Sequence, residues 1–194
     1  MSINYYDENA EKFFDNTFQL NMKDIYQKFT PNITNGGKIL DAGCGSGRDV
    51  KAFIEMGYDV IGFDSSIEMV QMSKKLSKSD NIFHLDFNDV EWENEFDGVW
   101  ACASLLHVTE KDFQSVGKKI YKSLKKDAPF YLSFKYGYKS YTKDNRFFQC
   151  HDENSLKKEM NKIGLFLKDE FWLTHDIRPD RKDEKWLNAI YIKG

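Results

Sequence analysis

The feature that most constrains the fold is the segment ILDAGCGSGR at residues 39–48, in which three glycines alternate. Gly43, Gly45 and Gly47 follow directly after a short apolar run that ends in Asp41. Because glycine has no Cβ, it allows the backbone to turn sharply and to approach a ligand closely. The loop also lies between a predicted strand and a predicted helix, and this context indicates a nucleotide- or nucleoside-binding turn.

Apolar runs and helical patterns alternate along the whole chain, and this alternation predicts an α/β sheet with crossover helices. The predicted strands lie at residues 38–40, 59–63, 82–85, 96–103, 130–136, 165–174 and 186–192. The predicted helices lie at residues 7–29 (one or two helices), 48–56, 66–76, from Thr109 onward, and 155–163. Residues 136–148 are expected to form a loop that is rich in aromatic and cationic side chains.

The composition fits one globular domain, because the chain has 194 residues of which 41% are hydrophobic. No segment approaches the ~20 continuous apolar residues that a membrane span requires, and the polar, acidic start is not a secretory signal. Three widely spaced cysteines without a CxxC pattern indicate neither a disulfide framework nor a zinc site, so we expect no metal and a cytoplasmic location. The net charge of −3 argues against bulk attraction to nucleic acid, although a local basic patch could still bind it.

The glycine loop departs from the dinucleotide fingerprint G-x-G-x-x-G, which would need a third glycine at position 48. That position holds Arg48, whose bulk does not suit the close packing of helix on strand that the fingerprint provides. The acid two residues before the first glycine disfavours an anionic pyrophosphate and suits a cationic or neutral ligand. An ordinary tight turn between strand and helix is the alternative interpretation.

Acids close the second and third predicted strands. Asp64 ends the second strand, 17 residues after Gly47, and ligands of parallel α/β sheets bind at the carboxyl ends of strands. A carboxylate there can accept hydrogen bonds from both hydroxyls of a ribose, or it can cap the helix that begins at Ser66, or both. Asp86 and Phe87 end the third strand, where they could reach and flank an adenine ring. The alternative for this pair is a turn acid and a core phenylalanine.

Small residues followed by polar ones close the fourth predicted strand, in the segment ACASLLHV at residues 101–108. The small side chains leave room for a ligand, and Ser104 and His107 follow at the same edge. An imidazole with an ordinary pKa near 6.5 can accept a proton from a nucleophile, so His107 is the candidate general base. The alternative is a structural histidine before the helix that Thr109 caps.

Two aromatic segments and a charged loop are candidates for binding a substrate. Tyr5 and Tyr6 open the chain, and residues 134–148 alternate aromatic and cationic side chains up to and beyond Arg146. Both segments could close over a ligand, stack bases of single-stranded RNA, or form packed surface loops. Arg178, in the loop between the last two predicted strands, could bind a carboxylate or phosphate or form local salt bridges.

These motifs resemble those of the class I S-adenosylmethionine-dependent methyltransferases, most clearly in DAGCGSG and GFDSS, and the resemblance covers about residues 1–136. It implies a three-layer, Rossmann-like α/β fold. The sheet would have seven strands, mostly parallel with an antiparallel last strand, and helices would cover both faces. It also implies a single domain over residues 1–194, in which residues 1–30 form a helical cap over the cofactor site and residues 31–194 form the Rossmann-like core.

In that family the glycine loop wraps the methionine part of the cofactor, the acid closing strand two binds the ribose, and the end of strand three meets the adenine. The resemblance thus implies that S-adenosylmethionine, and its product S-adenosylhomocysteine, bind at Tyr6, Asp41, Gly43, Cys44, Gly45, Asp64, Ser65, Met69, Asp86, Phe87 and Ala101. Asp41 would orient the loop or hold the cofactor's amino group. Ser104, Arg146 and Arg178 would contact the substrate, with His107 as the base.

The sequence therefore predicts an enzyme, a methyltransferase acting on a small-molecule or tRNA-borne nucleophile. The segment Ser-Leu-Leu-His at residues 104–107 stands where many amino-methylating relatives have Asn/Asp-Pro-Pro-Tyr, which disfavours adenine and glutamine as acceptors. Two other hypotheses stay open: a non-catalytic cofactor-binding regulator, and a nicotinamide-dependent oxidoreductase, against which Arg48 argues. No membrane association and no obligate protein partner are expected.

Overall fold

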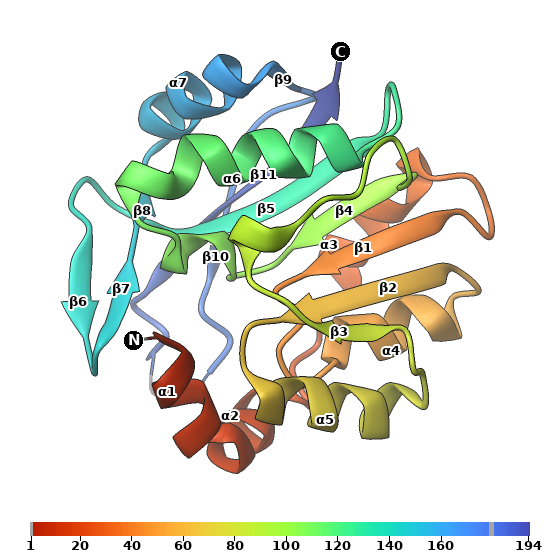
Figure 1. The fold of residues 1–194 in the computed structure, drawn as a ribbon. Coiled ribbons are helices and arrows are strands. Elements are labelled where there is room, and N and C mark those ends of the chain that lie inside the picture. Colours follow the sequence, from red (N-terminus) through yellow and green to blue (C-terminus); the bar gives the residue numbers. More distant parts are fainter. Residues whose placement is uncertain (1, 179–180) are drawn as a thin grey trace.

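The computed structural model of the protein describes residues 2–178 and 181–194, which fold around one central sheet (Figure 1). The main path of the sheet is β3 (Ile82–His84), β2 (Asp59–Asp64), β1 (Lys38–Ala42), β4 (Gly98–Ala101), β5 (Pro129–Tyr136), β11 (Lys185–Lys193) and β10 (Trp172–His175). The strands from β3 to β5 are parallel, whereas β11 is antiparallel to both β5 and β10. The predicted mostly parallel sheet with an antiparallel last strand is therefore confirmed.

Two short strands bring the sheet to nine strands in the described part of the chain, instead of the seven predicted. They are β8 (Cys150–His151), which pairs with β5, and β9 (Leu165–Leu167), which pairs with β11. The prediction of one continuous strand at residues 165–174 is wrong, because the exposed polar residues Lys168, Asp169 and Glu170 divide it into β9 and β10.

Helices cover both faces of the sheet and complete a three-layer arrangement (Figure 1). One face carries α3 (Lys23–Phe29), α4 (Arg48–Glu55) and α5 (Ile67–Ser77), and the other carries α6 (Glu110–Ser123) and α7 (Glu153–Ile163). Thr109 caps α6, since its hydroxyl accepts a hydrogen bond from the Asp112 N–H at 3.3 Å, as the sequence predicts. The helix expected to start near Ser155 begins two residues earlier, after the cap residue Asp152.

The central strands are apolar on both sides because each side faces a different layer of helices. Ile39 and Trp100 join the core under α3 and α4, whereas Leu40 and Val99 join the core under α6 and α7. Parallel strands buried on both faces have such continuous apolar runs. Because the strands themselves are apolar, polar side chains that could bind a ligand lie in the loops at the carboxyl ends of the strands.

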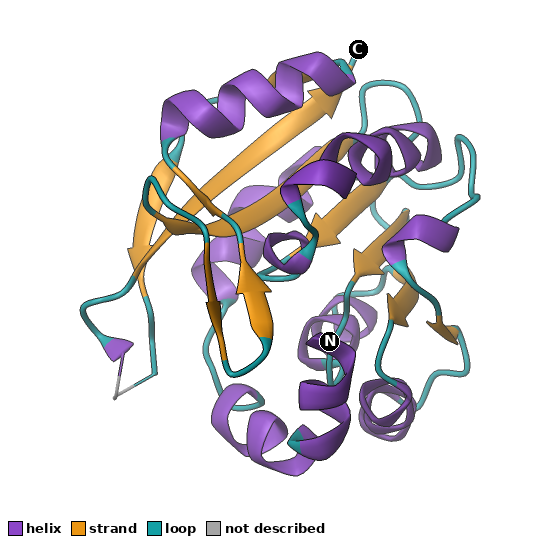
Figure 2. Ribbon diagram, turned by 60° about the vertical axis from the view of Figure 1, so that its left-hand side comes forward, coloured by secondary structure: helices purple, strands orange, loops and turns teal. Residues whose placement is uncertain are grey.

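Residues 136–148 contain a β-hairpin, so the predicted loop is wrong for this segment. The hairpin consists of β6 (Tyr141–Lys143) and β7 (Arg146–Phe148), and it extends from the sheet toward the N-terminal helices (Figure 2). Asp144 and Asn145 form its turn with φ of +50° and +57°. Two left-handed residues are what a type I′ turn requires, and Asp and Asn tolerate that conformation. The dipeptide was therefore the signal for a hairpin in this aromatic segment.

The N-terminal residues form two helices, α1 (Ser2–Glu8) and α2 (Ala10–Thr17). Helix α1 contacts α5 on one side and β7 on the other. The Ser66 hydroxyl, at the start of α5, donates a hydrogen bond to Asp7 at 2.5 Å. The contacts of α1 therefore bring it beside the carboxyl end of β2 and beside the hairpin.

Candidate functional site

The glycine loop at residues 43–47 connects β1 to α4 and has a backbone that only glycine adopts readily. Gly43, Gly45 and Gly47 have φ of +76°, +53° and +90°. A Cβ on Gly43 would lie 2.5 Å from the Cβ of Ser104, so the loop has no room for a side chain there. The Ser104 hydroxyl donates a hydrogen bond to the Ala42 carbonyl at 2.6 Å, so its proton is already engaged within the protein.

Asp64 joins the glycine loop to the loop after β2. Its Oδ2 accepts a hydrogen bond from the Gly45 N–H, and its Oδ1 accepts one from the Ser66 N–H, both at 2.9 Å. Ser66 in turn caps α5 by accepting from the Met69 N–H at 3.2 Å. Burial raises the pKa of Asp64 from its usual range. A single carboxylate therefore fixes the relative positions of two loops at the carboxyl edge of the sheet.

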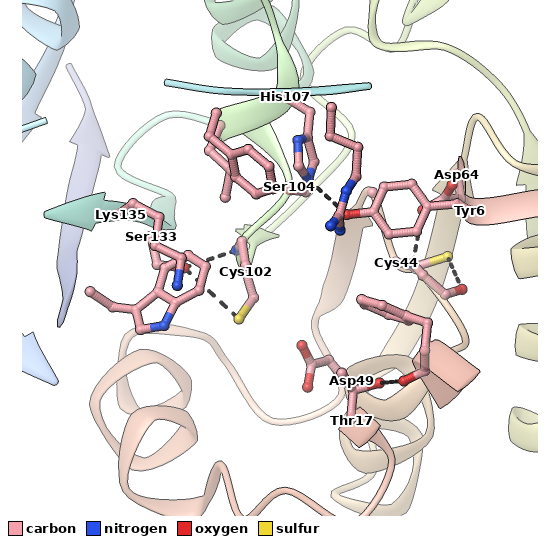
Figure 3. Close-up of a pocket in the computed structure, with 18 of the residues that line it drawn as sticks. Tyr6, Thr17, Cys44, Asp49, Asp64, Cys102, Ser104, His107, Ser133 and Lys135 are labelled. Carbon is pink, nitrogen blue, oxygen red and sulfur yellow. Dashed lines mark hydrogen bonds between the residues drawn. The ribbon is translucent and has the colours of Figure 1, made fainter. Parts of the chain in front are cut away.

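These loops border a cavity of about 650 Å³, a size that is usual for small-molecule sites of ~300–1,000 Å³. Figure 3 shows Cys44, Asp64 and Tyr6 on one side of it, Ser133 and Lys135 on the opposite side, and His107 between them. The predicted site residues that line the cavity are Tyr6, Gly43, Cys44, Gly45, Asp64, Ser65, Met69, Asp86, Phe87, Ser104, His107, Arg146 and Arg178. Most of the residues singled out from the sequence thus meet at one place.

Two of the predicted cofactor residues do not line the cavity. Ala101 is fully buried within β4, and the next two residues, Cys102 and Ala103, form the wall instead. Asp41 is 2% exposed beneath the glycine loop, and its Oδ2 has no hydrogen-bond partner. Burial and the nearby charge of Asp49 raise the pKa of Asp41 well above its usual range.

Asp86 and Phe87 occupy the rim beyond β3. Asp86 accepts a hydrogen bond from the Asn88 N–H at 2.8 Å, which is the turn-forming role that the sequence left open. The Phe87 ring lies edge-on to Phe63 with ring centroids 5.1 Å apart. Both residues still border the cavity, so the local roles do not remove them from the site.

His107 uses both of its ring nitrogens. The Phe147 carbonyl lies 2.7 Å from Nδ1, and because a carbonyl only accepts, Nδ1 carries the proton. Nε2 then accepts the hydrogen bond from the Tyr6 hydroxyl at 2.8 Å (Figure 3). Burial lowers the pKa of His107 to about 4. The lone pair that a general base needs is thus already occupied by Tyr6.

Arg146 lies against the same group of rings. Its guanidinium carbon is 3.6 Å from the centre of the Tyr5 ring and 5.2 Å from that of Phe148. The side chain is buried, and it forms an ion pair of 3.3 Å with the half-exposed Asp144. Its Nε has no hydrogen-bond partner in the described part of the chain. We refer to Tyr5, Tyr6, His107, Arg146 and Phe148 as the Tyr6–Arg146 cluster.

Arg178 is part of an ion-pair network rather than an isolated cation. It donates two hydrogen bonds to the buried carboxylate of Asp176, at 2.8 and 2.5 Å. The same carboxylate accepts from Lys135 at 3.2 Å, and Lys135 also pairs with Glu184. The hydrogen bonds and charge of Arg178 lower the pKa of Asp176 well below its usual range, against the effect of burial. We call Lys135, Asp176, Arg178 and Glu184 the Lys135 cluster.

The sequence analysis left local salt bridges open for Arg178 but did not predict the part of Lys135, and it missed a second network at the start of α4. Asp49 accepts hydrogen bonds from Arg48 at 2.6 Å, from the Trp100 indole at 2.8 Å and from the Tyr26 hydroxyl. Arg48 therefore has a buried partner and forms part of the cavity wall. The sequence signals for these networks were weak. They were a lysine in the apolar strand FYLSFKY and an acid at the second position of α4, and neither residue type by itself indicates a buried ion pair.

Residues 2–178 and 181–194 show neither a metal-binding cluster nor a membrane-spanning helix. No three side chains of His, Cys, Asp and Glu come together there in a way that could hold a metal ion. None of the helices described is both long and apolar enough to cross a membrane.

Comparison with known proteins gives a family for the central part of the chain. Residues 39–127, which include the glycine loop, Asp64 and His107, match the model of the methyltransferase domain family. This stretch therefore resembles a methyltransferase domain, and the chain has the fold of the class I, Rossmann-like methyltransferases.

One curated relative is YqeM, a methyltransferase candidate from Bacillus subtilis (strain 168). The two sequences are 32% identical over 100 residues, which is 48% of this chain and 40% of the relative. The match thus spans less than half of the relative's length.

Solved structures share the fold over nearly the whole chain. One is the 1,6-didemethyltoxoflavin-N1-methyltransferase of Burkholderia thailandensis, solved with 1,6-didemethyltoxoflavin and S-adenosylhomocysteine bound. Its TM-score is 0.81 at 19% identity, and the match covers 99% of this chain and 85% of that chain. A methyltransferase candidate of Haloferax volcanii, in complex with the Trm112 methyltransferase activator, has a TM-score of 0.78 at 15% identity, covering 99% and 97%. At these identities the likeness concerns the fold alone.

Proposed function

We propose that the protein is an S-adenosylmethionine-dependent methyltransferase whose acceptor is a small molecule. The observation that carries the proposal is the joining of the glycine loop to Asp64 at the edge of a cavity large enough for two ligands to meet. We further propose that residues 1–30 act as a helical cap over the cofactor site and residues 31–194 as the core.

The residues present fit the cofactor. The Gly43 position, which a Cβ would fill, lets the backbone approach a ligand, and the Asp64 carboxylate has lone pairs left for the ribose hydroxyls after its two backbone hydrogen bonds. The other residues proposed to hold the cofactor from the cavity wall are Tyr6, Cys44, Gly45, Ser65, Met69, Asp86 and Phe87, while the buried Asp41 would support the glycine loop from beneath. The cofactor, when bound, supplies an electrophilic methyl group on a positively charged sulfur.

The chain itself contributes positioning and exclusion of water. A displacement in line with the sulfur–carbon bond needs the acceptor held close and aligned, and this alone can lower a barrier by several kcal/mol. Tyr6, His107 and Arg146 stand at the side of the cavity next to Ser104, where an acceptor would be enclosed. A cavity of about 650 Å³ has room for a small acceptor beside the cofactor, and a tRNA-borne base remains the alternative acceptor.

Two other functions make different predictions. A cofactor-binding regulator would bind S-adenosylhomocysteine but release none from S-adenosylmethionine with any acceptor. A nicotinamide-dependent oxidoreductase would be stabilised against heat by a nicotinamide dinucleotide, and Arg48, paired with Asp49 next to the glycine loop, argues against this ligand.

Calorimetry with S-adenosylhomocysteine tests the assignment of the cofactor site. Asp64→Asn is expected to bind at least 30-fold more weakly, because an amide has one acceptor oxygen where the carboxylate has two. The matched control is Asp59→Asn at the opposite, exposed end of β2, which we expect to bind within twofold of the wild type. Urea unfolding confirms that each variant is folded. Unchanged affinity in a folded Asp64→Asn protein would refute the ribose assignment.

Release of S-adenosylhomocysteine tests the class of acceptor. A cell extract is divided by size into metabolites and tRNA, and each fraction is added to the purified protein with S-adenosylmethionine. We expect product only with the metabolite fraction. Product with the tRNA fraction alone would replace the small-molecule proposal, and no product with either would favour the regulator.

A further inference from the structure

The starting point is a buried cation with unused hydrogen-bonding capacity. Arg146 is 6% exposed and lines the cavity with its guanidinium over aromatic rings. Its buried Nε has no hydrogen-bond partner, and its ion pair with Asp144 is long and lies toward solvent. A guanidinium carries five N–H donors in a fixed plane. Burial of a charge is unfavourable unless it is well paired, and the pair with the half-exposed Asp144 is long, so this position suits a ligand that brings a second negative charge.

Three other cations of the cavity wall already have carboxylate partners inside the protein, and a fourth, Arg181, is also engaged in a contact. Lys135 and Arg178 share Asp176, and Arg48 is bonded to Asp49. An anionic ligand would have to compete with these pairs, whereas Arg146 can bind it without breaking a buried pair. The position for an anion is therefore beside the Tyr6–Arg146 cluster.

No free base accompanies this position among the residues that the structure describes in contact with Arg146. His107 donates from Nδ1 to the Phe147 carbonyl and accepts at Nε2 from Tyr6. The Tyr6 hydroxyl is thus a donor, and burial raises its pKa further. An acceptor whose nucleophilic atom still carries a proton at neutral pH would find no group here to remove it.

The surroundings of Arg146 are aromatic and suit an organic body. The rings of Tyr6, Phe13, Phe147 and Phe148 line the cavity together with the guanidinium. An aromatic wall around one cation fits a molecule with an apolar, flat part and one charged group. A bare inorganic ion would leave these rings uncovered.

We propose that the methyl acceptor is a small organic carboxylate, held by Arg146 through one oxygen and methylated on the other. The inference rests on the proposed function. A carboxylate is ionised at neutral pH, since its ordinary pKa is about 4, so no base is needed. A lone pair of the free oxygen forms the new bond to the methyl carbon, and the electron pair of the broken sulfur–carbon bond stays on the sulfur. The products are a neutral methyl ester and S-adenosylhomocysteine, and no proton moves.

The test compares acids with their amides, which have nearly the same shape but no charge. Benzoate, phenylacetate and hexanoate are each paired with the corresponding amide, and formation of S-adenosylhomocysteine and of methyl ester is measured. We expect at least one acid to react with a kcat/KM at least 100-fold above that of its amide. Amides that react as well as the acids, or a panel in which no acid reacts and none raises the Tm of the S-adenosylhomocysteine complex, would overturn the proposal.

Variants on the hairpin locate the effect. Arg146→Gln is expected to lower kcat/KM for the acids at least 100-fold, mainly by raising KM, and to leave the amides unchanged. Arg146→Lys keeps the charge but not the planar fork, so we expect a loss of about tenfold. Lys143→Gln is the matched control, because Lys143 is an exposed cation on the same hairpin that does not line the cavity, and it should stay within twofold.

Binding of S-adenosylhomocysteine separates this proposal from the proposed function. All three variants are expected to bind it within threefold of the wild type. If Arg146→Gln loses this binding while remaining folded, Arg146 contacts the cofactor and the carboxylate proposal fails alone. If the wild type does not bind S-adenosylhomocysteine, the proposed function fails.

Discussion

The glycine loop and the Tyr6–Arg146 cluster border the same cavity but are built in different ways. The glycine loop is a stretch of five consecutive residues whose shape follows from backbone conformation and from one carboxylate, Asp64. The Tyr6–Arg146 cluster brings together α1, the segment after β4 and the hairpin, which are about 40 and 100 residues apart in the sequence. The first is determined locally, and the second exists only once the chain has folded.

This difference indicates which part of the site changes easily. Replacing a glycine of the loop changes the backbone and affects any ligand that the loop binds. A side chain of the cluster can be replaced while the sheet and the loop stay in place. The fold can therefore keep one cofactor site and vary its acceptor, and the predictions that follow examine this separation.

The largest effect is expected from Gly43→Ala. The residue has φ of +76°, and a Cβ would lie 2.5 Å from that of Ser104. We expect at least 1,000-fold weaker binding of S-adenosylhomocysteine in calorimetry, which corresponds to about 4 kcal/mol. Gly36→Ala is the control, since Gly36 has a similar φ of +74° but open space around it. If both variants bind alike, the loop is not a close-approach site.

A smaller effect, on stability and not on the cofactor, is expected from Asp176→Asn. The buried Asp176 carboxylate accepts hydrogen bonds from Lys135, Arg178 and Trp186. Removing its charge leaves Lys135 and Arg178 without this carboxylate partner, and we expect the free energy of unfolding to fall by about 3 kcal/mol. Asp183→Asn, at an exposed position of the same segment, should change it by less than about 0.5 kcal/mol.

Urea unfolding measures the stability of both variants, and calorimetry measures their affinity for S-adenosylhomocysteine. We expect that affinity to stay within threefold of the wild type. A parallel loss of stability and of cofactor affinity in Asp176→Asn would show that the two sides of the cavity are not independent.

The smallest effect is the pH dependence contributed by His107. Its pKa is about 4 when folded and about 6.5 when unfolded, so the unfolded chain binds the extra proton first as the pH falls. The stabilising contribution is complete above pH 6.5 and is lost as the pH falls toward 4. Between pH 7 and pH 5 the loss is about 2 kcal/mol.

Comparing the wild type with His107→Gln isolates this contribution, because Asp41, Asp64 and His151 titrate in both proteins. Glutamine can still donate to the Phe147 carbonyl and accept from Tyr6. Urea unfolding at the two pH values should show a loss in the wild type that exceeds the loss in the variant by this amount. Equal losses would mean that His107 is not buried in a neutral state.

The sequence was sufficient for the sheet, the crossover helices and the glycine loop, because these follow from hydrophobic periodicity and from glycine spacing within short windows. It failed for the hairpin, where the aromatic residues of the segment obscured the turn signal of Asp144 and Asn145. It also failed for the strand at residues 165–174. Two apolar runs were joined there into one strand across the polar residues 168–170, and the pairing with β11 shows where each piece ends.

For the site, the sequence correctly selected residues at the carboxyl ends of strands, since a parallel sheet brings these ends together. It could not tell that His107 is engaged on both nitrogens, because its partners come from α1 and the hairpin. Nor could it separate Arg146 from Arg178, since their different burial and pairing arise from tertiary contacts. The sequence thus showed which side chains could bind a ligand, but it did not show which of them already have hydrogen-bond or ion-pair partners in the folded protein.

The hydrogen bond between the Gly45 N–H and Asp64 also has a kinetic consequence. It holds the loop in shape by a contact within the protein itself, so the conformational entropy of ordering the loop is lost during folding and not during binding. A ligand then meets a rigid surface, and its association rate should depend on diffusion and access rather than on rearrangement of the loop.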